Sequence, residues 1–430
     1  MGNDLNQAQA RIDALLDANS FVELQSLVTA RSTDLTADAK KEPSDGVIIG
    51  HGLVDGTPVF VFSQNADVLG GTIGEMHAKK ILSVYDMALK VGAPVIGFLD
   101  CSGVRLQESY DALEALGSVI AKATDLKGVI PQLICVAGNC GGGLSVLPAI
   151  ADFSFMVEGA SLFVNAPDTI PGNRSDENDT SSAAFQYEEA GTVDFIGSLD
   201  EVVASMKSVL DIVLNDISDC TDDLNRASVG LEDHLSDAAA IATELADNRN
   251  FLEVKAGYAK DMVTGFMKLD GETIGVVGNR EVDGEATLSA QGCEKAADFV
   301  ELCDMYEIPL VTITNVEAYK ACVCQEKKLP RALAALTRSL VEASVPKLNL
   351  IAKQAYGTGY VLMNSKSMGA DMVFAFADSK IAAMAPDKAA KAGVALSDDA
   401  ASAAAHGRVD RVVSYADARK YIISEFEMFF

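Results

Sequence analysis

Two stretches of the chain, residues 131–143 (PQLICVAGNCGGG) and residues 346–358 (PKLNLIAKQAYGT), carry one pattern 215 residues apart. Each begins with a proline, continues as a largely apolar run typical of a buried strand, and ends in a turn that contains glycine. Pro131 matches Pro346 and Gly142 matches Gly357 at this spacing. Repetition at a fixed spacing is the sequence signature of a duplicated unit. The chain therefore looks like two copies of one domain.

The same spacing relates residues outside these stretches. Asp55-Gly56 matches Asp270-Gly271, Lys80 matches Lys295, Pro94 matches Pro309 and, after a slip of four residues, Ala151-Asp152-Phe153 matches Ala370-Asp371-Met372. Several matches at one spacing, set among the same apolar runs, are hard to obtain by chance. We assign residues 1–225 to the first copy and residues 226–430 to the second, with an acidic helical segment at about residues 215–250 bridging them.

The sequence of each copy predicts the same order of strands and helices. Hairpins after the Asp-Gly turns are expected at residues 59–62 and 274–277, and helices at residues 77–91 and 296–306. Buried strands are expected at residues 95–99, 133–136, 310–313 and 348–351. Buried strands joined by helices are typical of a parallel sheet reached by crossover connections. The sequence therefore predicts an α/β protein built from a repeated βαβ layer.

Composition excludes several classes of protein. The 430 residues carry a net charge of −28 without a basic stretch, which disfavours nucleic-acid binding. Hydrophobic residues make up 49% and charged residues 22%, as expected for a large globular core. The uncharged run at residues 128–151 is long enough to cross a bilayer. Because it holds two prolines and five glycines, we interpret it as a strand, a glycine turn and a helix.

Cysteine usage and the N-terminus indicate a reducing compartment. The eight cysteines form no dense cluster, so a disulfide framework is not expected in a chain of this size. The first residues lack both a basic region and an apolar core, so no secretory signal is predicted. We expect a cytoplasmic protein.

Glycine turns are the strongest candidates for a site. One turn, residues 100–108, follows a buried strand, and the other, residues 138–143, lies where the next strand gives way to a helix. Glycines at a helix start leave backbone N–H groups unpaired and allow close approach of a ligand. Two such turns facing one another would form an oxyanion hole. Close packing of a buried turn also selects glycine, and this pattern alone does not separate the two explanations.

Other chemistries have weaker support in the sequence. The four histidines are too far apart for a local metal motif, and the Cys322-x-Cys324 pair, without a second pair, is interpreted as incidental; no metal site is predicted. Ser145 has no evident base partner and is interpreted as a packed helix residue. His77 and Lys79-Lys80, after Gly70-Gly71, are interpreted as a solvated first helical turn.

The segments together resemble the carboxyltransferase subunit of biotin-dependent acyl-CoA carboxylases and decarboxylases, of the propionyl-CoA carboxylase β type. The resemblance covers nearly the whole chain. It is carried by residues 12–24, 60–64, 70–80, 92–97, 105–108 and 148–153 in the first half, and by residues 294–297, 303–304, 308–311, 355–357 and 368–371 in the second.

This resemblance implies a tandem crotonase-like fold, with acyl-CoA bound by the first copy and biotin, attached to a separate carrier protein, facing the second. It implies transfer of a carboxyl group between biotin and the α-carbon of a short acyl-CoA thioester, without a side-chain acid or base. The implied partners are a biotin carboxyl carrier protein and a biotin carboxylase or membrane decarboxylase subunit. A homo-oligomer, either a dimer or a trimer of dimers, is also implied.

The resemblance assigns roles to particular residues. The backbone of Gly142, Gly143, Gly103 and Val104 would form the first oxyanion hole, and that of Thr358 and Gly359 the second. Acyl-CoA binding would use Gly70, Gly71, Arg105 and Gly141, and the biotin side would include Tyr356 and Gly357.

The chain also departs from the family pattern. Residues 101–104 read Cys-Ser-Gly-Val where the family has Ser-Gly-Gly-Ala, and residues 357–359 read Gly-Thr-Gly where it has Gly-Gly-Ala. The family's Pro-Gly-Phe turn is replaced by residues 316–320, and the loop at residues 165–191 is altered and shortened. These changes motivate an alternative, a non-catalytic scaffold or CoA-binding subunit. A CoA hydratase is disfavoured because the glycine-turn helices carry no suitable glutamate pair.

Overall fold

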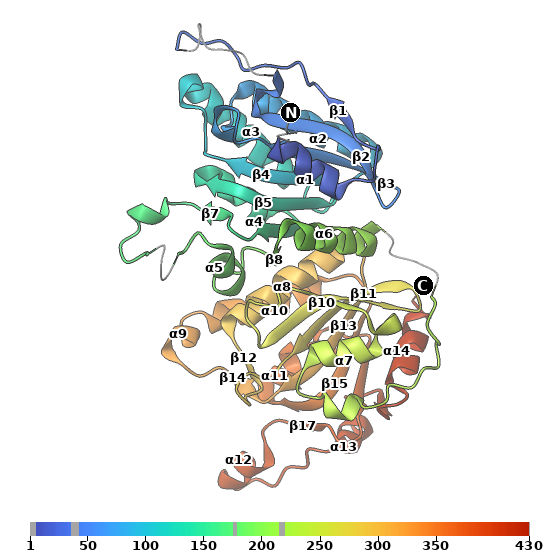
Figure 1. Cartoon of the computed structure of the whole chain (residues 1–430). Helices are drawn as coiled ribbons and strands as arrows, with labels where there is room; N and C mark the ends of the chain where they lie inside the picture. The colour runs from blue at the N-terminus through green and yellow to red at the C-terminus, as the bar shows by residue number, and fades with distance from the viewer. Residues whose placement is uncertain (1–5, 36–42, 175–178, 215–219, 430) are drawn as a thin grey trace. The chain divides into compact units, whose positions relative to one another are not determined.

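The computed structural model describes residues 6–35, 43–174, 179–214 and 220–429. The chain forms two compact units, Met1–Leu210 and Asp211–Phe430, seen in Figure 1. The break between the units falls within helix α6 (Leu199–Leu214). Each unit contains one large sheet with its own hydrophobic core, and each is described by itself below.

The sheet of the first unit runs in the order β1-β2-β3-β4-β5-β6-β8, with β7 paired to β5. Strands β1 to β3 are antiparallel, and β3 to β8 pair in parallel. The strands are β1 (Val22–Leu24), β2 (Val47–Val54), β3 (Thr57–Gln64), β4 (Val95–Cys101), β5 (Gln132–Gly141), β6 (Phe153–Val157), β7 (Ser161–Phe163) and β8 (Phe195–Gly197). The helices besides α6 are α1 (Gln7–Leu15), α2 (Glu75–Val91), α3 (Tyr110–Asp125), α4 (Val146–Ile150) and α5 (Ala183–Glu188).

The sheet of the second unit has the matching order β9-β10-β11-β13-β15-β16-β18, with β17 paired to β15. Its strands are β9 (Phe251–Val254), β10 (Met262–Leu269), β11 (Glu272–Asn279), β13 (Leu310–Val316), β15 (Lys347–Tyr356), β16 (Met372–Phe376), β17 (Lys380–Ala382) and β18 (Arg411–Val413), with the small pair β12 (Thr287–Leu288) and β14 (Ala318–Tyr319) apart from it. The helices are α7 (Ala238–Leu245), α8 (Ala290–Met305), α9 (Val323–Glu326), α10 (Leu329–Glu342), α11 (Gly357–Leu362), α12 (Pro386–Lys391), α13 (Ala400–Ala405) and α14 (Ala418–Phe426). The predicted duplication is therefore confirmed strand by strand.

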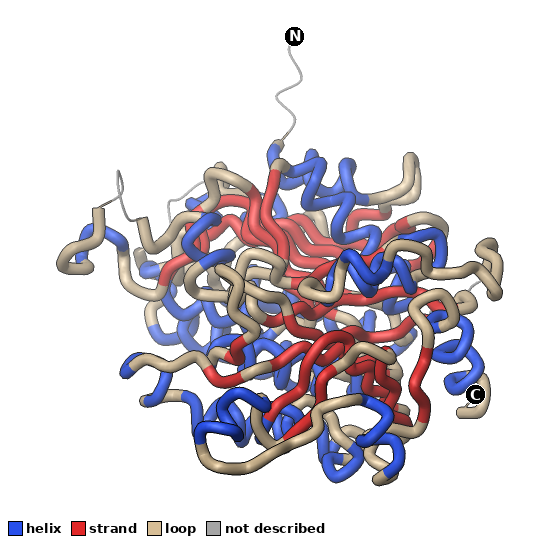
Figure 2. The backbone as a smooth tube through the Cα atoms, turned by 90° about the horizontal axis from the view of Figure 1, so that it is seen from below, coloured by secondary structure: helices blue, strands red, loops and turns tan. Residues whose placement is uncertain are grey.

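Helices pack on the sheet faces, as expected when every parallel strand is followed by a crossover. Helix α2 contacts β2, β3 and α3, while α8 contacts β10, β11 and α10. Figure 2 shows the strands, in red, gathered into sheets, with helices, in blue, beside them. The uncharged run forms β5, a glycine turn and the short helix α4, as predicted. None of the helices in the described part of the chain is both long and apolar enough to span a membrane.

The Asp-Gly hairpins are held in the same way in both units. Asp55-Gly56 and Asp270-Gly271 all have positive φ, as a two-residue type I′ turn requires. The carboxylate of Asp17 accepts the two N–H groups of the first turn at 3.0 and 2.9 Å. The carboxylate of Asp247 accepts those of the second at 3.2 and 2.8 Å. Each hairpin is thus anchored by an aspartate that precedes it in the chain.

Two lysines at matching positions are buried in α2 and α8. Lys80 Nζ donates to the carbonyls of Ser44 and Val47, and Lys295 Nζ donates to those of residues 255, 258 and 262. Burial lowers the pKa of Lys80 to about 8 and that of Lys295 to about 7. The interpretation of Lys79-Lys80 and His77 as a solvated turn is wrong for His77 and Lys80, both of which are fully buried. The helix turns them toward carbonyl groups that lie far away in the sequence.

We predict that Lys295→Met changes the pH dependence of stability. The unfolded chain holds the amine proton up to the ordinary pKa near 10.5, whereas the folded chain loses it near 7. Because the unfolded state then binds more protons, the wild type should gain stability relative to the variant as pH rises from about 7 to about 10. Urea unfolding of both proteins across this range measures the difference. Parallel profiles would contradict the assignment.

Candidate active site

Four glycines at the ends of β4 and β5 show why these turns need glycine. Gly103 and Gly142 have φ of +115° and +65°, where L side chains are strained, and a Cβ on either would point into open space. A Cβ on Gly138 would lie 2.1 Å from the Asp100 carboxylate, and a Cβ on Gly141 would lie 2.6 Å from the ring of Phe163. Close packing therefore explains Gly138 and Gly141, whereas backbone conformation explains Gly103 and Gly142.

The second of these turns presents unpaired N–H groups. A short 3₁₀ turn, Gly142–Ser145, begins directly after β5, and its first N–H groups have no partner within the turn. Within the described residues, no side chain caps this turn. The hydroxyl of Ser145 donates to the Gly142 carbonyl at 2.7 Å, so Ser145 is a packed residue, as predicted.

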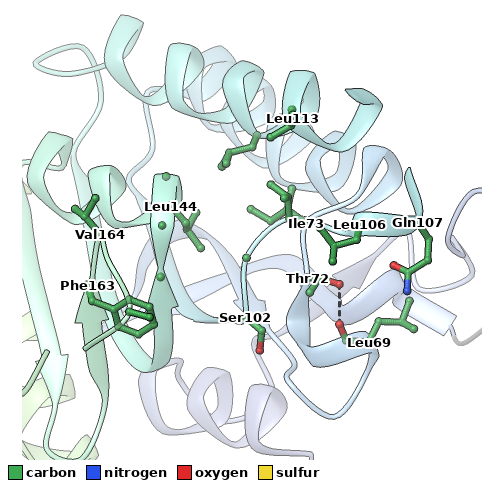
Figure 3. Close-up of a pocket in the computed structure, with 17 residues that line it drawn as sticks. Leu69, Thr72, Ile73, Ser102, Leu106, Gln107, Leu113, Leu144, Phe163 and Val164 are labelled. Atoms are coloured by element: carbon green, nitrogen blue, oxygen red, sulfur yellow. Dashed lines mark hydrogen bonds between the residues drawn. The ribbon is translucent and has the colours of Figure 1, made fainter. Parts of the chain in front are cut away.

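The two turns line one cavity of about 810 Å³ in the first unit. Residues Ser102, Gly103 and Val104 come from the first turn and Gly141, Gly142 and Gly143 from the second. Figure 3 shows Leu144, Ile73, Leu106 and Phe163 around the same space. None of the described residues that line the cavity carries a charge. The structure thus brings the residues proposed for the first oxyanion hole together in a largely apolar pocket.

The thiols beside these turns are not activated. Burial raises the pKa of both Cys101 and Cys140. The Cys101 sulfur is hydrogen-bonded to the N–H and the carbonyl of Gly103, which fixes it locally. His77 is no better placed as a base, because burial lowers its pKa to about 3 and holds it neutral. The groups that this site offers to a developing negative charge are therefore peptide N–H groups.

Arg105 lies beneath the first turn and does not line the cavity. Its guanidinium pairs with Asp45 at 2.7 Å and with Glu108 at 2.9 Å, and it also donates to the Thr72 carbonyl at 2.8 Å. Glu108 in turn accepts the N–H of Glu75 at the start of α2. This buried network joins the loop after β4 to α2, so the Arg105 side chain acts on the turn by holding its position.

Sequence reasoning missed the partners of Arg105. Burial raises the pKa of Asp45, partly offset by the neighbouring Arg105 charge. Asp45 lies in a short irregular segment before β2, and no motif marks it.

Gly70 and Gly71 were expected to bind acyl-CoA. Both have positive φ, which favours glycine, and a Cβ on Gly71 would lie 2.1 Å from the Asp100 carbonyl oxygen.

We predict that Arg105→Met destabilises the protein by about 3–5 kcal/mol, because it leaves two buried carboxylates without their cation. Chemical denaturation measures the loss. Arg31→Met is the matched control, since Arg31 also pairs with two carboxylates, Glu75 and Asp111, but on the surface. The control should be close to wild type. Equal effects of the two substitutions would contradict the assigned role.

The second unit has a corresponding glycine turn after β15. Gly357 has φ +59°, and a Cβ on Gly359 would lie 2.7 Å from Val316. Tyr356 precedes the helix α11 and provides no side-chain cap; its hydroxyl donates to Asp398 at 2.9 Å. Thr358 is exposed, and its hydroxyl is hydrogen-bonded to that of Tyr319. The four residues expected on the biotin side thus share one turn.

The segment that replaces the family's Pro-Gly-Phe turn is ordered around β14. Its residues pair in parallel with β12, in the register Thr287 with Ala318 and Leu288 with Tyr319. Cys322 and Cys324, interpreted from the sequence as an incidental pair, are exposed and joined by a disulfide. Among the described residues, no group of three or more His, Cys, Asp or Glu is placed to hold a metal ion.

Comparison with known proteins identifies the family. The model of the carboxyl transferase domain matches residues 5–428. The chain belongs to the carboxyl transferase family. The match extends through both copies, which confirms the resemblance drawn from the sequence motifs.

Relatives of this carboxyl transferase are subunits of carboxylating and decarboxylating enzymes. It is 35% identical to the methylmalonyl-CoA decarboxylase subunit alpha of Propionigenium modestum, over 88% of this chain and 77% of the relative. It is equally 35% identical to the propionyl-CoA carboxylase beta chain of Roseobacter denitrificans, over 88% of this chain and 78% of the relative.

A solved structure confirms the crotonase-like fold. The transcarboxylase 12S structure, described as a hexamer with hydrolysed methylmalonyl-coenzyme A bound, superimposes with a TM-score of 0.92 at 31% identity. The match covers 98% of this carboxyl transferase and 89% of that chain. The fold class predicted from the repeated βαβ layers is therefore correct for the whole described chain.

Proposed function

We propose that this carboxyl transferase moves a carboxyl group between biotin on a separate carrier protein and the α-carbon of a short acyl-CoA, of the propionyl- or methylmalonyl-CoA class. The observation that carries the proposal is the glycine-lined cavity in a chain of this family. Relatives named as propionyl-CoA carboxylase and methylmalonyl-CoA decarboxylase subunits support the substrate class.

The two glycine turns of the first unit, after β4 and after β5, supply the groups that the thioester needs. Removing or adding a carboxyl group at the α-carbon places negative charge on the thioester oxygen, so stabilising that charge lowers the barrier. Gly142 and Gly143 would donate their N–H groups from one side and Val104 from the other. The Gly103 N–H would join them only by leaving the Cys101 sulfur. Peptide donors held in a water-poor pocket do not need to reorganise when the charge appears, which makes them effective.

The uncharged lining of the cavity agrees with this role. Apolar side chains such as Leu113, Leu116 and Phe163 surround the turns, and a short acyl chain would contact them. Their low polarity also strengthens the interaction between the peptide N–H groups and the oxyanion. The phosphate groups of CoA would therefore lie outside this cavity.

The glycine turn after β15, residues 356–359, is the proposed biotin side. Carboxybiotin would supply the carboxyl group when bound, and the N–H groups of this turn would stabilise negative charge on its ureido oxygen. Thr358 and Gly359 lie in the first turn of α11, where N–H groups have no partner within the helix. Tyr356 and Gly357 shape the approach to them. The N–H groups of Thr358 and Gly359 could therefore donate hydrogen bonds to the negatively charged ureido oxygen of biotin.

The partners follow from the reaction. A biotin carboxyl carrier protein must bring its biotin to the glycine turn after β15. A biotin carboxylase or a membrane decarboxylase subunit must add the carboxyl group to that biotin or remove it. We propose a homo-oligomer, either a dimer or a trimer of dimers, in which the site is completed; the hexamer described for transcarboxylase 12S supports this arrangement. We also propose a cytoplasmic location.

A carboxyl-exchange assay tests the proposed function. Purified protein is mixed with a biotinylated carrier and labelled malonyl- or methylmalonyl-CoA, and label is followed into unlabelled acetyl- or propionyl-CoA. Co-purification from native cells, blotted for biotin, supplies the cognate carrier. Exchange with a short acyl-CoA supports the proposal. A bound carrier and bound acyl-CoA without exchange would favour the non-catalytic alternative.

We predict that Gly143→Val lowers transfer at least ~100-fold, since the valine side chain would cover the N–H donors of the glycine turn after β5. The fold should persist because a Cβ at Gly143 meets only Leu116, at 3.3 Å. Gly117→Ala is the matched control: Gly117 lies exposed in α3 with open space around its Cβ. Exchange rates and melting temperatures of both variants measure the effect. Normal transfer by Gly143→Val would show that the oxyanion assignment is wrong.

A further inference from the structure

The two departures of the second copy from the family pattern contact one another. Tyr319 replaces part of the Pro-Gly-Phe turn, and Thr358 replaces a glycine in the turn before α11. The Tyr319 hydroxyl and the Thr358 Oγ1 are 2.8 Å apart, a hydrogen bond of normal length between residues 39 positions apart. The two changes therefore have to be considered as one feature.

The internal repeat shows what this pair replaces. The 215-residue spacing relates Tyr319 to Val104 and Thr358 to Gly143, both of which line the cavity of the first unit. The backbone pairing agrees, since Val104 forms a parallel bridge with Ile73, as Tyr319 does with Leu288. The first copy leaves these two places without hydroxyl groups, whereas the second copy fills them with two.

The backbone around Tyr319 is held by hydrogen bonds on both sides of β14. The N–H groups on either side of β14, those of Glu317 and Lys320, donate to the carbonyls of Ala286 and Leu288 at 2.8 and 2.9 Å. The ring is half-buried. Burial raises the pKa of Tyr319, so the hydroxyl keeps its proton and remains able to donate.

The turn that holds Thr358 depends on such support. It follows Gly357, which has φ +59° and, as a glycine, can adopt many other backbone conformations. Within the described residues no side chain caps α11. The Tyr356–Asp398 hydrogen bond holds one side of the turn, and the Tyr319–Thr358 bond holds the other. Loss of the second bond would allow the N–H groups of Thr358 and Gly359 to move.

We propose that Tyr319 and Thr358 are a positioning pair that fixes the biotin-side turn for carboxyl transfer. The proposal rests on the proposed function of that turn. Neither residue takes part in bond making; the pair compensates for a glycine turn that the family builds differently. It acts on the carrier-bound biotin and leaves acyl-CoA binding in the first unit unchanged.

Four variants test the pair in the full-length protein: Tyr319→Phe, Thr358→Ala, Thr358→Ser and the double variant with Phe and Ala. A neutral hydrogen bond is worth about 0.5–1.5 kcal/mol, so Tyr319→Phe and Thr358→Ala should each lower kcat/KM for the carboxylated carrier about 2- to 10-fold. The KM for acyl-CoA should stay unchanged. The double variant should be no worse than either single variant, and Thr358→Ser, which keeps a hydroxyl group, should lose less activity than Thr358→Ala.

Hydrogen exchange provides a readout that does not depend on activity. The amides of residues 358–362 should exchange faster in Tyr319→Phe than in the wild type. Tyr415→Phe is the matched control, since the Tyr415 hydroxyl also forms a hydrogen bond to a side chain, that of Asp378, but outside the glycine turns. The control should alter neither exchange at α11 nor the kinetics.

The outcomes separate this proposal from the proposed function. Three results would contradict the proposed role of the pair while leaving the transfer activity in place. They are additive losses of kcat/KM in the double variant, unchanged amide exchange in α11, and a rise in the KM for acyl-CoA as large as the loss of kcat/KM for the carrier. A wild-type protein without carboxyl exchange would instead contradict the proposed function, and amide exchange would still decide whether the pair holds the turn.

Discussion

The reversal of the backbone at Gly142 and Gly357 is the constraint on which the rest of the structure depends. Strands β5 and β15 each lie in the parallel part of their sheet, and each is followed directly by a glycine with left-handed φ. That reversal starts a helix directly at the strand end, which exposes peptide N–H groups at the edge of the sheet. In the first unit this turn lines the cavity together with the loop after β4, and the buried network at Arg105 ties that loop to α2.

Much of the fold was predictable because its signals are local. Asp-Gly turns require positive φ, buried strands show apolar runs, and a duplicated unit repeats both at one spacing. The sheet orders confirmed the duplication completely. The glycine turns could also be located, but only the structure separates Gly138 and Gly141, which allow close packing, from Gly103 and Gly142, which need an unusual backbone conformation.

What could not be predicted depends on contacts between distant segments. His77 and Lys80 follow a glycine pair and look like the polar start of a helix, yet both are buried against the segment before β2. The partners of Arg105 come from positions 60 residues before it and three after it. The Tyr319–Thr358 contact was visible in the sequence only as two separate losses, because a hydrogen bond between two substituted positions leaves no local pattern.

The peptide N–H donors of the glycine turns in the first unit affect how the sequence of such a protein can change during evolution. A donor that belongs to the main chain survives nearly every substitution at its own position, provided that the backbone keeps its path. Selection on this enzyme would then act mainly on shape, leaving the apolar lining free to exchange side chains. Lineages could thus change the acyl group they accept by drifting at residues such as Leu113 or Phe163, without rebuilding the chemistry.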